Sequence, residues 1–404
     1  MEVTTSVKRS WWQSLGPGLI TAALVFGPGS LTVMSKLGAI YGYDLLWVLV
    51  ITTVLMMAFT AMGARIGLVS PISLLQLFRN KWGKAVAIFT GVAIFFVTAS
   101  FQAGNTIGAG IAFAESFQTD AAPWIVLISL LAIGLLFFKS FYRILEKMMM
   151  LMVALMLLSF IFTVILAKPN LFDLVQGLVP SIPQNSILLV VAMVASTFSI
   201  AGAFYQAYLV QEKGWKLSEM KLATHEGLSG ILVLGLISGM ILISAAAILH
   251  PQGIQVNAAG DMGKSLEPLY GNFASVIFML GLFGASFSSL VGNATIGGTL
   301  FADAISLGRD LNSLPVKVLI TTIILIGTTV ALVFGKLPLE LIIFAQGITI
   351  FAVPFIGIGI LLIANDPQIM GKYTNKKRHN IPGIIGILVL LVLAGSNFYS
   401  LFLS

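Results

Sequence analysis

The sequence predicts an all-α, polytopic membrane protein. Its 404 residues are 58% hydrophobic and 9% charged, whereas soluble domains carry about 25% charged residues. Apolar runs of about 20 residues, the length that spans a bilayer as a helix, recur along the whole chain. We expect eleven spans, at residues 16–36, 44–63, 85–113, 123–138, 148–167, 186–210, 227–249, 272–300, 317–334, 338–363 and 382–402. Residues 1–404 should therefore form a single transmembrane domain in the lipid bilayer.

Basic residues predict the orientation of the spans. If the N-terminus is cytoplasmic, 18 of the 22 Lys and Arg residues fall in cytoplasmic segments, and Lys36, Lys168, Lys264 and Lys336 fall on the other side. Cytoplasmic loops carry the excess of Lys and Arg, so we expect a multi-pass cell-membrane protein with its N-terminus cytoplasmic and its C-terminus outside. The net charge of +7 is then a topology signal, and no nucleic-acid partner is expected.

Two spans contain residues that interrupt a membrane helix. Span 1 holds Gly27-Pro28-Gly29-Ser30, where proline removes a hydrogen-bond donor and clashes with the preceding turn. Span 6 reads VASTFSIAGAFYQAYLV and holds Thr197 and Gly202 near its middle, two residues of poor helix propensity. The alternative is an ordinary packed kink. Interrupted helices at matching positions of two halves indicate a transporter site at the midplane, with residues 16–167 and 186–363 as inverted repeats and span 382–402 appended.

Ionisable residues are almost absent from the predicted interior. Nearly all Asp and Glu residues fall in loops or at span ends, and so do His225, His250 and His379. We therefore expect no carboxylate–histidine set at membrane depth for transition-metal binding, proton relay or hydrolysis. The chain has no cysteine, which excludes disulfides and thiolate metal sites. These absences disfavour an enzyme, and no cofactor is expected.

Four stretches carry a resemblance to a known family: LGPGLITAALVFGPGSL, ARIGLVSPISLLQLFRNKWG, GLFGASFSSLVGNATIGGTLFAD and IFAQGITIFAVPFIGIGILLIANDPQIMG. They resemble the natural-resistance-associated macrophage protein (Nramp) family of divalent-metal transporters, from span 1 through span 10. The resemblance implies the fold of LeuT-type amino-acid transporters, in which the first and sixth helices are unwound around the substrate.

The chain departs from this family at the metal ligands. The family's span 1 motif is Asp-Pro-Gly-Asn, and its two ligating side chains correspond here to Gly27 and Ser30. The Ala carbonyl and the Met thioether of the family's span 6 correspond to Ser196 and Ser199. Gln346 matches the family's span 10 glutamine. Without the carboxylate and the thioether the site is neutral and lined with hydroxyls, so we expect no metal ligands of the family type.

A neutral site with a broken helix favours an anionic group, because the start of a helix presents free N–H groups. We therefore expect a secondary transporter for a small organic solute, a carboxylate such as an amino acid or a cyclic relative. The N–H groups of Gly29, Ser30 and Leu31 would hold the carboxylate, Ser196, Thr197, Ser199 and Gly202 would line the other side, and Phe198 would cover the pocket.

Two alternatives stay open. In the first, the chain is a divalent-cation transporter that takes a hard ion such as magnesium through carbonyls, hydroxyls and waters. In the second, it is a sensor or channel without active transport. A channel is disfavoured because no charged ring or carbonyl filter motif is visible.

The coupling ion is expected to be Na⁺ or H⁺. The span 3 Asp and Glu that form a proton route in the family correspond here to Gln102 and Asn105, which cannot relay a proton by ionisation. Sodium needs only oxygen donors, and LeuT-type transporters commonly hold it between span 1 carbonyls and span 8 hydroxyls. Ser286, Ser288 and Ser289 are the candidates for these hydroxyls, with simple packing as the alternative role.

Overall fold

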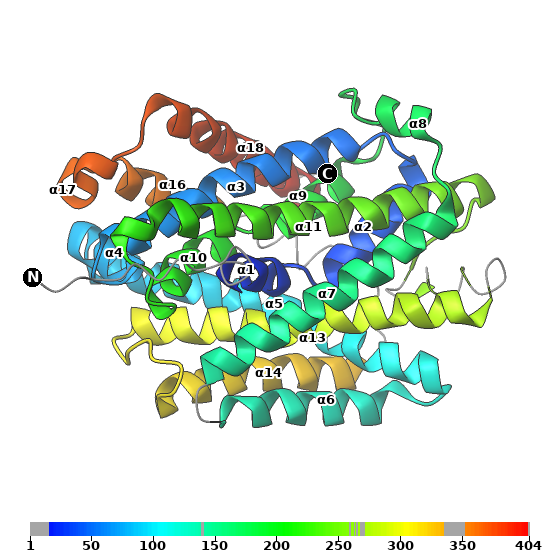
Figure 1. Cartoon of the computed structure of the whole chain (residues 1–404), viewed down its shortest axis with the longest axis horizontal. Coiled ribbons are helices and arrows are strands. Elements are labelled where there is room, and N and C mark those ends of the chain that lie inside the picture. Colours follow the sequence, from blue (N-terminus) through cyan, green and yellow to red (C-terminus); the bar gives the residue numbers. More distant parts are fainter. Residues whose placement is uncertain are drawn as a thin grey trace, which may run out of the picture.

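The computed structural model describes residues 16–138, 141–257, 260–261, 263, 266, 271–334 and 352–402. All regular elements in these ranges are helices, and they lie side by side in one elongated bundle (Figure 1). The helices of the first half are α1 (Gly16–Val25), α2 (Pro28–Tyr41), α3 (Leu46–Val69), α4 (Leu74–Trp82), α5 (Lys84–Phe117), α6 (Ala121–Leu136) and α7 (Phe141–Ala167). Those of the second half are α8 (Leu171–Gln176), α9 (Ile187–Thr197), α10 (Ile200–Glu212), α11 (Met220–Ile248), α13 (Asn272–Ala304), α14 (Leu314–Phe334), α16 (Val353–Ala364), α17 (Pro367–Met370) and α18 (Lys377–Phe402).

Ten predicted spans coincide with helices, and the two expected interruptions are real. Span 1 is divided into α1 and α2, and span 6 is divided into α9 and α10. Of span 10, residues 338–351 lie outside the described residues, and the remainder is α16. The short helices α4, α8 and α17 were not expected. In α4 a capping box between Ser73 and Gln76 fixes the first turn, and such a box satisfies N–H groups that the helix leaves free.

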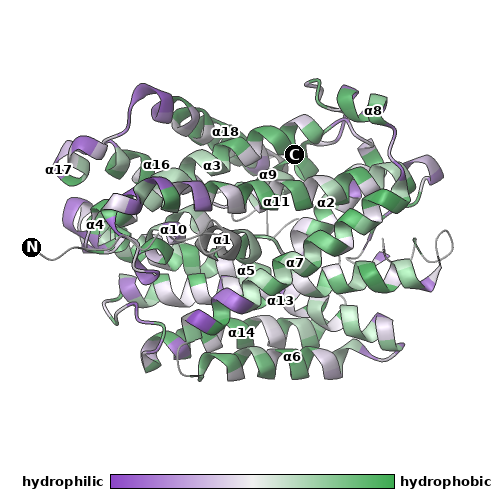
Figure 2. Ribbon diagram, viewed as in Figure 1, coloured by the Kyte–Doolittle hydropathy of each residue, from purple (hydrophilic) through white to green (hydrophobic). Residues whose placement is uncertain are grey.

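The surface of the bundle is that of a protein in lipid. Eight helices in the described part of the chain are long and apolar enough to cross a membrane, and α16 with α17 forms a further pair bent by 57°. Large apolar side chains on the outer helices are exposed, such as Leu158 at 72% on α7 and Val392 at 69% on α18. Hydrophilic residues gather toward the ends of the bundle, most clearly near α4 and α17 (Figure 2). A soluble monomer rarely exposes apolar surface on this scale.

The longest helices, α5 and α13, pack along each other through the bundle. They are the third and the eighth spans, which are equivalent positions in two repeats of five. Helix α1 lies among α7, α10, α11 and α13, so the break in span 1 is enclosed by helices. This arrangement agrees with the repeat boundaries at 16–167 and 186–363, which stay a prediction.

Helices α3 and α10 approach each other at backbone distance. A Cβ atom built at Gly63 would overlap the carbonyl oxygen of Ala203, and one at Gly67 would overlap that of Ala207. Small residues four apart allow membrane helices to pack this closely. The glycines thus fix one half of the second broken span against α3.

Substituting Gly63 by alanine should test this contact. Gly63→Ala is expected to lower the midpoint of thermal unfolding in detergent, because overpacking a tight contact costs roughly 1–3 kcal/mol. Gly134→Ala is the control, since a Cβ at Gly134 on α6 meets nothing within 4 Å. Both changes raise helix propensity by about 1 kcal/mol, so the difference between them isolates the packing. Equal midpoints for the two variants would show that α3 and α10 are not in backbone contact.

Candidate functional site at two broken helices

The first break lies between α1 and α2. Helix α1 ends at Val25, and α2 begins at Pro28, the first helical position, where a missing N–H removes no hydrogen bond. Gly27 is the residue before the helix, with extended backbone angles φ −123° and ψ −179°. The N–H of Leu31 already donates to the carbonyl of Gly27 at 3.1 Å. Gly29, Ser30 and Leu31 form the buried first turn of α2.

Ser289 on α13 satisfies the freed end of α1. Its hydroxyl lies 2.7 Å from the carbonyl oxygen of Phe26, and 3.4 Å from those of Ala23 and Leu24. The last carbonyls of a helix have no partner within the helix, and in a membrane an unsatisfied group costs several kcal/mol. The predicted meeting of span 8 hydroxyls and span 1 carbonyls is therefore present as a direct hydrogen bond. A sodium ion at this place stays a prediction.

The second break lies between α9 and α10. Helix α9 ends at Thr197 and α10 begins at Ile200. Ser199 is the residue before α10, and its hydroxyl accepts a hydrogen bond from the N–H of Gly202 at 3.2 Å. A Cβ atom at Gly202 would lie 2.7 Å from a methyl group of Val25. The two breaks thus lie next to each other, with Gly202 against Val25 at the end of α1.

The hydroxyls just before the second break turn back on their own helix. Ser196 and Thr197 donate to the carbonyl of Met193 at 2.9 and 2.8 Å, and the Thr197 hydroxyl also lies 3.1 Å from that of Thr52. Both residues are at most 4% exposed. Their predicted role as substrate ligands would require these hydrogen bonds to be exchanged.

Phe198 lies between the two halves of span 6 and packs into the core. It is 1% exposed, and its ring meets that of Phe59 edge to face at 5.4 Å between centroids. A Cβ atom at Gly386 on α18 would lie 2.9 Å from the Phe198 ring. The expected cover of a pocket is thus a packed side chain held between α3 and α18.

Gln102 and Asn105 on α5 are buried beside the first break. Gln102 donates from Nε2 to the carbonyl of Leu290 on α13 at 2.6 Å, and Asn105 donates from Nδ2 to Oε1 of Gln102 at 3.3 Å. A Cβ atom at Gly27 would lie 2.7 Å from Oδ1 of Asn105. The structure therefore brings both amides of span 3 to the break in span 1.

The remaining predicted residues, Ser286, Ser288 and Gln346, differ in their surroundings. Ser288 donates back to Ala285 at 3.1 Å, whereas the Ser286 hydroxyl is buried without a partner among the described residues. A Cβ atom at Gly108 would lie 2.5 Å from this hydroxyl and 2.6 Å from the ring of Pro28, so Ser286 faces α5 and the start of α2. Gln346 lies outside the described residues. In the described part of the chain no three residues among His, Asp and Glu gather as a metal site would require.

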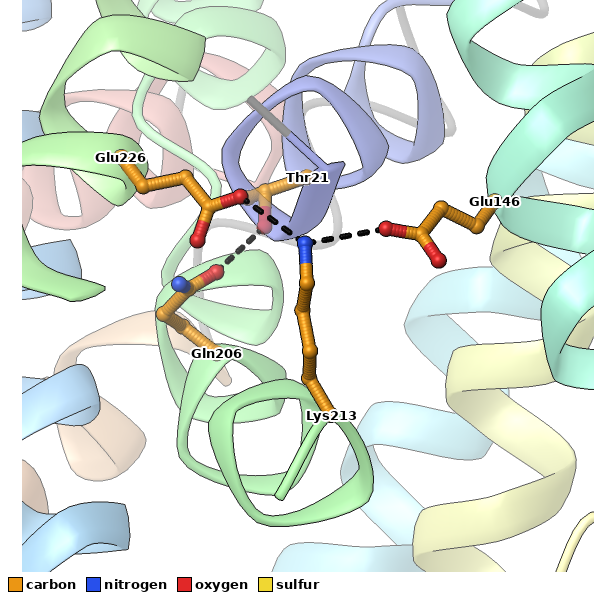
Figure 3. Close-up of polar contacts among 5 residues, drawn as sticks. All are labelled: Thr21, Glu146, Gln206, Lys213 and Glu226. Atoms are coloured by element: carbon orange, nitrogen blue, oxygen red, sulfur yellow. Dashed lines mark hydrogen bonds and ion pairs between the residues drawn. The ribbon is translucent and has the colours of Figure 1, made fainter. Parts of the chain in front are cut away.

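A buried ion cluster lies where α10 ends and α11 begins, toward one end of the bundle, and Figure 3 shows its residues. The ammonium group of Lys213 lies 3.0 Å from Glu146 and 3.3 Å from Glu226, and beside it the Thr21 hydroxyl donates to Oε1 of Gln206 at 2.5 Å. The Glu226 side chain is 1% exposed and that of Lys213 is 12% exposed. The cluster joins α7, α10 and α11, and the Thr21 hydrogen bond attaches α1 to α10.

Sequence reasoning missed this cluster. It treated Lys213 and Glu226 as charges near span ends, which is where a sequence window places them. The contact with Glu146 depends on how the start of α7 crosses the other two helices. A lysine and a glutamate that flank the short connection from α10 to α11 were the available signal.

A cavity of about 510 Å³ opens at the opposite end of the bundle, where α2 and α11 end. Two acidic residues, Asp44 and Asp173, line it together with Lys168 and His250. The ion cluster and this cavity thus lie at opposite ends of the bundle, with the two breaks between them.

A family model described as natural resistance-associated macrophage protein-like matches residues 18–401. The chain belongs to the Nramp family. Gly27 and Ser199, the residues at which we expect departures from the family's metal ligands, directly precede α2 and α10, and the departures themselves stay a prediction.

Curated Nramp relatives cover almost the whole chain. A divalent metal cation transporter MntH from Chromohalobacter salexigens is 26% identical over 97% of this chain and 92% of its own length. A divalent metal cation transporter MntH from Staphylococcus haemolyticus is 28% identical over 93% of this chain and 90% of its own length. These relatives are membrane transporters, not enzymes.

Solved structures show the same fold. The manganese transporter of Eremococcus coleocola, in complex with an aromatic bis-isothiourea compound, matches with a TM-score of 0.79 at 19% identity, over 99% of this chain and 91% of that chain. Mhp1, a nucleobase-cation-symport-1 family transporter, matches with a TM-score of 0.63 at 12% identity, over 96% and 93%. The expected LeuT-type fold is confirmed.

The predicted small organic solute is wrong, because the curated Nramp relatives are divalent metal cation transporters. The prediction relied on N–H groups at the start of α2, and one of them, that of Leu31, already donates to Gly27. It also overlooked the other side of each break. The C-terminal ends of α1 and α9 present carbonyl oxygens and the negative end of a helix dipole, which favour a cation.

Removing the lysine of the ion cluster should destabilise the protein. Lys213→Met is expected to lower the thermal midpoint, because breaking a buried pair leaves an uncompensated charge and costs roughly 3–5 kcal/mol. The double variant Lys213→Met/Glu226→Gln should recover most of the loss, since it removes the buried charge of Glu226. A double variant no more stable than Lys213→Met would show that the charges do not interact.

Proposed function

We propose that this chain is a secondary transporter that carries a hard divalent cation, such as Mg²⁺, through the breaks in spans 1 and 6. The observation that carries the proposal is the match of nearly the whole chain to divalent metal cation transporters. Helices α1 and α9 both end at the breaks, and carbonyl ends of interrupted helices hold cations in transporters of this fold.

The type of ion follows from the side chains at the breaks. Gly27 has no side chain, and Ser199 offers only a hydroxyl that already accepts from Gly202. Softer transition metals prefer imidazole, thioether or thiolate ligands. Mg²⁺ accepts oxygen ligands and keeps several of its waters. A site of carbonyl, hydroxyl and amide oxygens therefore suits a partly hydrated hard ion better than a dehydrated soft one.

Transport across the cell membrane would run between a cytoplasmic and an outer face. We assign the N-terminus to the cytoplasm and the C-terminus to the outside, on the 18-to-4 distribution of basic residues. The Lys213 cluster would then lie on the cytoplasmic side, and the cavity beside Asp44 and Asp173 would face outward. Among the described residues that line the outer cavity, the two carboxylates outnumber the one ammonium group, that of Lys168, and the resulting negative charge attracts cations to the entrance.

We assign Na⁺ as the coupling ion. The two polar residues of α5 at the break, Gln102 and Asn105, are amides that do not titrate. Ions that need only oxygen ligands can occupy such a neutral interior, whereas a proton requires a group that ionises.

Uptake into proteoliposomes should show the cation specificity. Purified protein is expected to drive Mg²⁺ uptake against its gradient and to bind Mn²⁺ by calorimetry no more tightly than about millimolar, or about −4 kcal/mol. Empty liposomes are the control. Micromolar Mn²⁺ binding would contradict the hard-ion assignment, downhill flux alone would indicate a channel, and the absence of any divalent flux would contradict the function.

Replacing the driving ion should identify the coupling. In the same liposomes, exchange of Na⁺ for choline is expected to abolish concentrative Mg²⁺ uptake, and collapse of the pH gradient with a protonophore is expected to leave it unchanged. The physical reason is the absence of an ionisable side chain among Gln102, Asn105 and Gly27. The opposite result would assign the coupling to protons.

A further inference from the structure

The glycine at position 27 is not required by its backbone. With φ −123° and ψ −179°, Gly27 is in the extended region that any residue adopts. Its neighbours exclude a side chain instead, because a Cβ atom there would lie 2.7 Å from Oδ1 of Asn105 and 3.1 Å from Oγ of Ser289. The space beside the break, where the family pattern has an aspartate, is thus occupied by an amide oxygen from another helix.

Hydrogen bonds determine which end of the Asn105 amide faces the break. The carbonyl of Leu290 can only accept, so Gln102 must present its NH₂ group there, at 2.6 Å. The Oε1 atom of Gln102 is then directed to Asn105, which must donate from Nδ2 at 3.3 Å. These two steps leave Oδ1 as the end of Asn105 that points to Gly27.

Both amides are buried, and neighbouring helices restrict their positions. Gln102 is 0% exposed and Asn105 is 3% exposed, and a Cβ atom at Gly327 on α14 would lie 2.5 Å from Cγ of Gln102. Three helices, α5, α13 and α14, therefore confine the first amide. A buried amide without full hydrogen bonding destabilises a membrane protein, and a rigid amide oxygen is a good ligand for a hard cation.

We propose that Oδ1 of Asn105 is a ligand of the transported divalent cation, and that Gln102 is a positioning residue that holds it toward the break. The inference rests on the proposed function and extends it to a named side chain. Asn105 supplies a neutral oxygen close to the carbonyl end of α1, where the side chain of residue 27 is missing. Gln102 acts through Asn105, as an outer hydrogen-bond partner orients a metal ligand.

The test measures Mg²⁺ and Mn²⁺ affinity of full-length variants by calorimetry, with the thermal midpoint as a folding check. Asn105→Leu is expected to weaken Mg²⁺ binding by about tenfold or more, and Asn105→Ala, which removes the amide without adding an apolar branch, to weaken it by a similar factor. Thr106→Val is the control, because the Thr106 hydroxyl bonds only to the carbonyl of Gln102 on its own helix. It should bind Mg²⁺ as the wild type does.

Gln102→Leu tests the positioning role. Leucine can neither donate to the carbonyl of Leu290 nor accept from Asn105, so Mg²⁺ affinity should fall by about tenfold although Gln102 itself does not touch the ion. In the Asn105→Leu background the same change should alter the affinity no further, because Gln102 acts only through Asn105. A merely structural role of Gln102 would lower the thermal midpoint and leave the Mg²⁺ affinity unchanged, which would overturn the positioning role.

The Asn105 variants distinguish a failure of this inference from a failure of the proposed function. If the wild type binds no divalent cation, the proposed function fails, and the inference with it. If the wild type binds Mg²⁺ and Asn105→Leu binds it equally, only the inference is overturned. Should Asn105→Leu prove unstable, Asn105→Ala decides, because an unchanged Mg²⁺ affinity in that variant places Oδ1 away from the ion.

Discussion

Backbone groups freed inside a membrane must find partners, and the centre of this protein is organised around that requirement. Dividing spans 1 and 6 leaves carbonyls at the ends of α1 and α9 and N–H groups at the starts of α2 and α10. Ser289 reaches across from α13 to the carbonyl of Phe26, and Ser199 receives the N–H of Gly202. The breaks persist because neighbouring side chains satisfy groups that lipid cannot, and a carbonyl oxygen that accepts one hydrogen bond keeps a second lone pair, through which the proposed cation would bind.

The breaks and the spans could be predicted from the sequence because their signals are local. A proline after glycine in an apolar run marks the first break, and Thr197 with Gly202 marks the second. Helix starts were less accurate, since α7 and α11 extend to Phe141 and Met220, beyond the apolar runs. Polar residues prolong these helices at the ends of the bundle, where hydropathy gives no signal.

Contacts between helices could not be predicted in the same way. That Asn105 meets Gly27, or that Lys213 meets Glu146, depends on the rotation and crossing of helices more than 60 residues apart in the chain. The substrate class failed for a related reason. The prediction of an anionic substrate relied on the absence of one aspartate at position 27. The C-terminal ends of α1 and α9 still supply partial negative charge, and the amide of Asn105 on α5 fills the space beside Gly27.

The contact of Gly63 and Gly67 with α10 also sets how the broken span can move. Two backbones that touch without intervening side chains cannot slide or separate by small rotamer changes, so α3 and α10 form one mechanical unit. Any rearrangement that carries α10 must carry α3 with it, whereas α9 packs against both α2 and α3. Both halves of span 6 therefore rest on α3, and Phe198 and Ser199, the two residues between α9 and α10, are the point where this span can bend without losing that support.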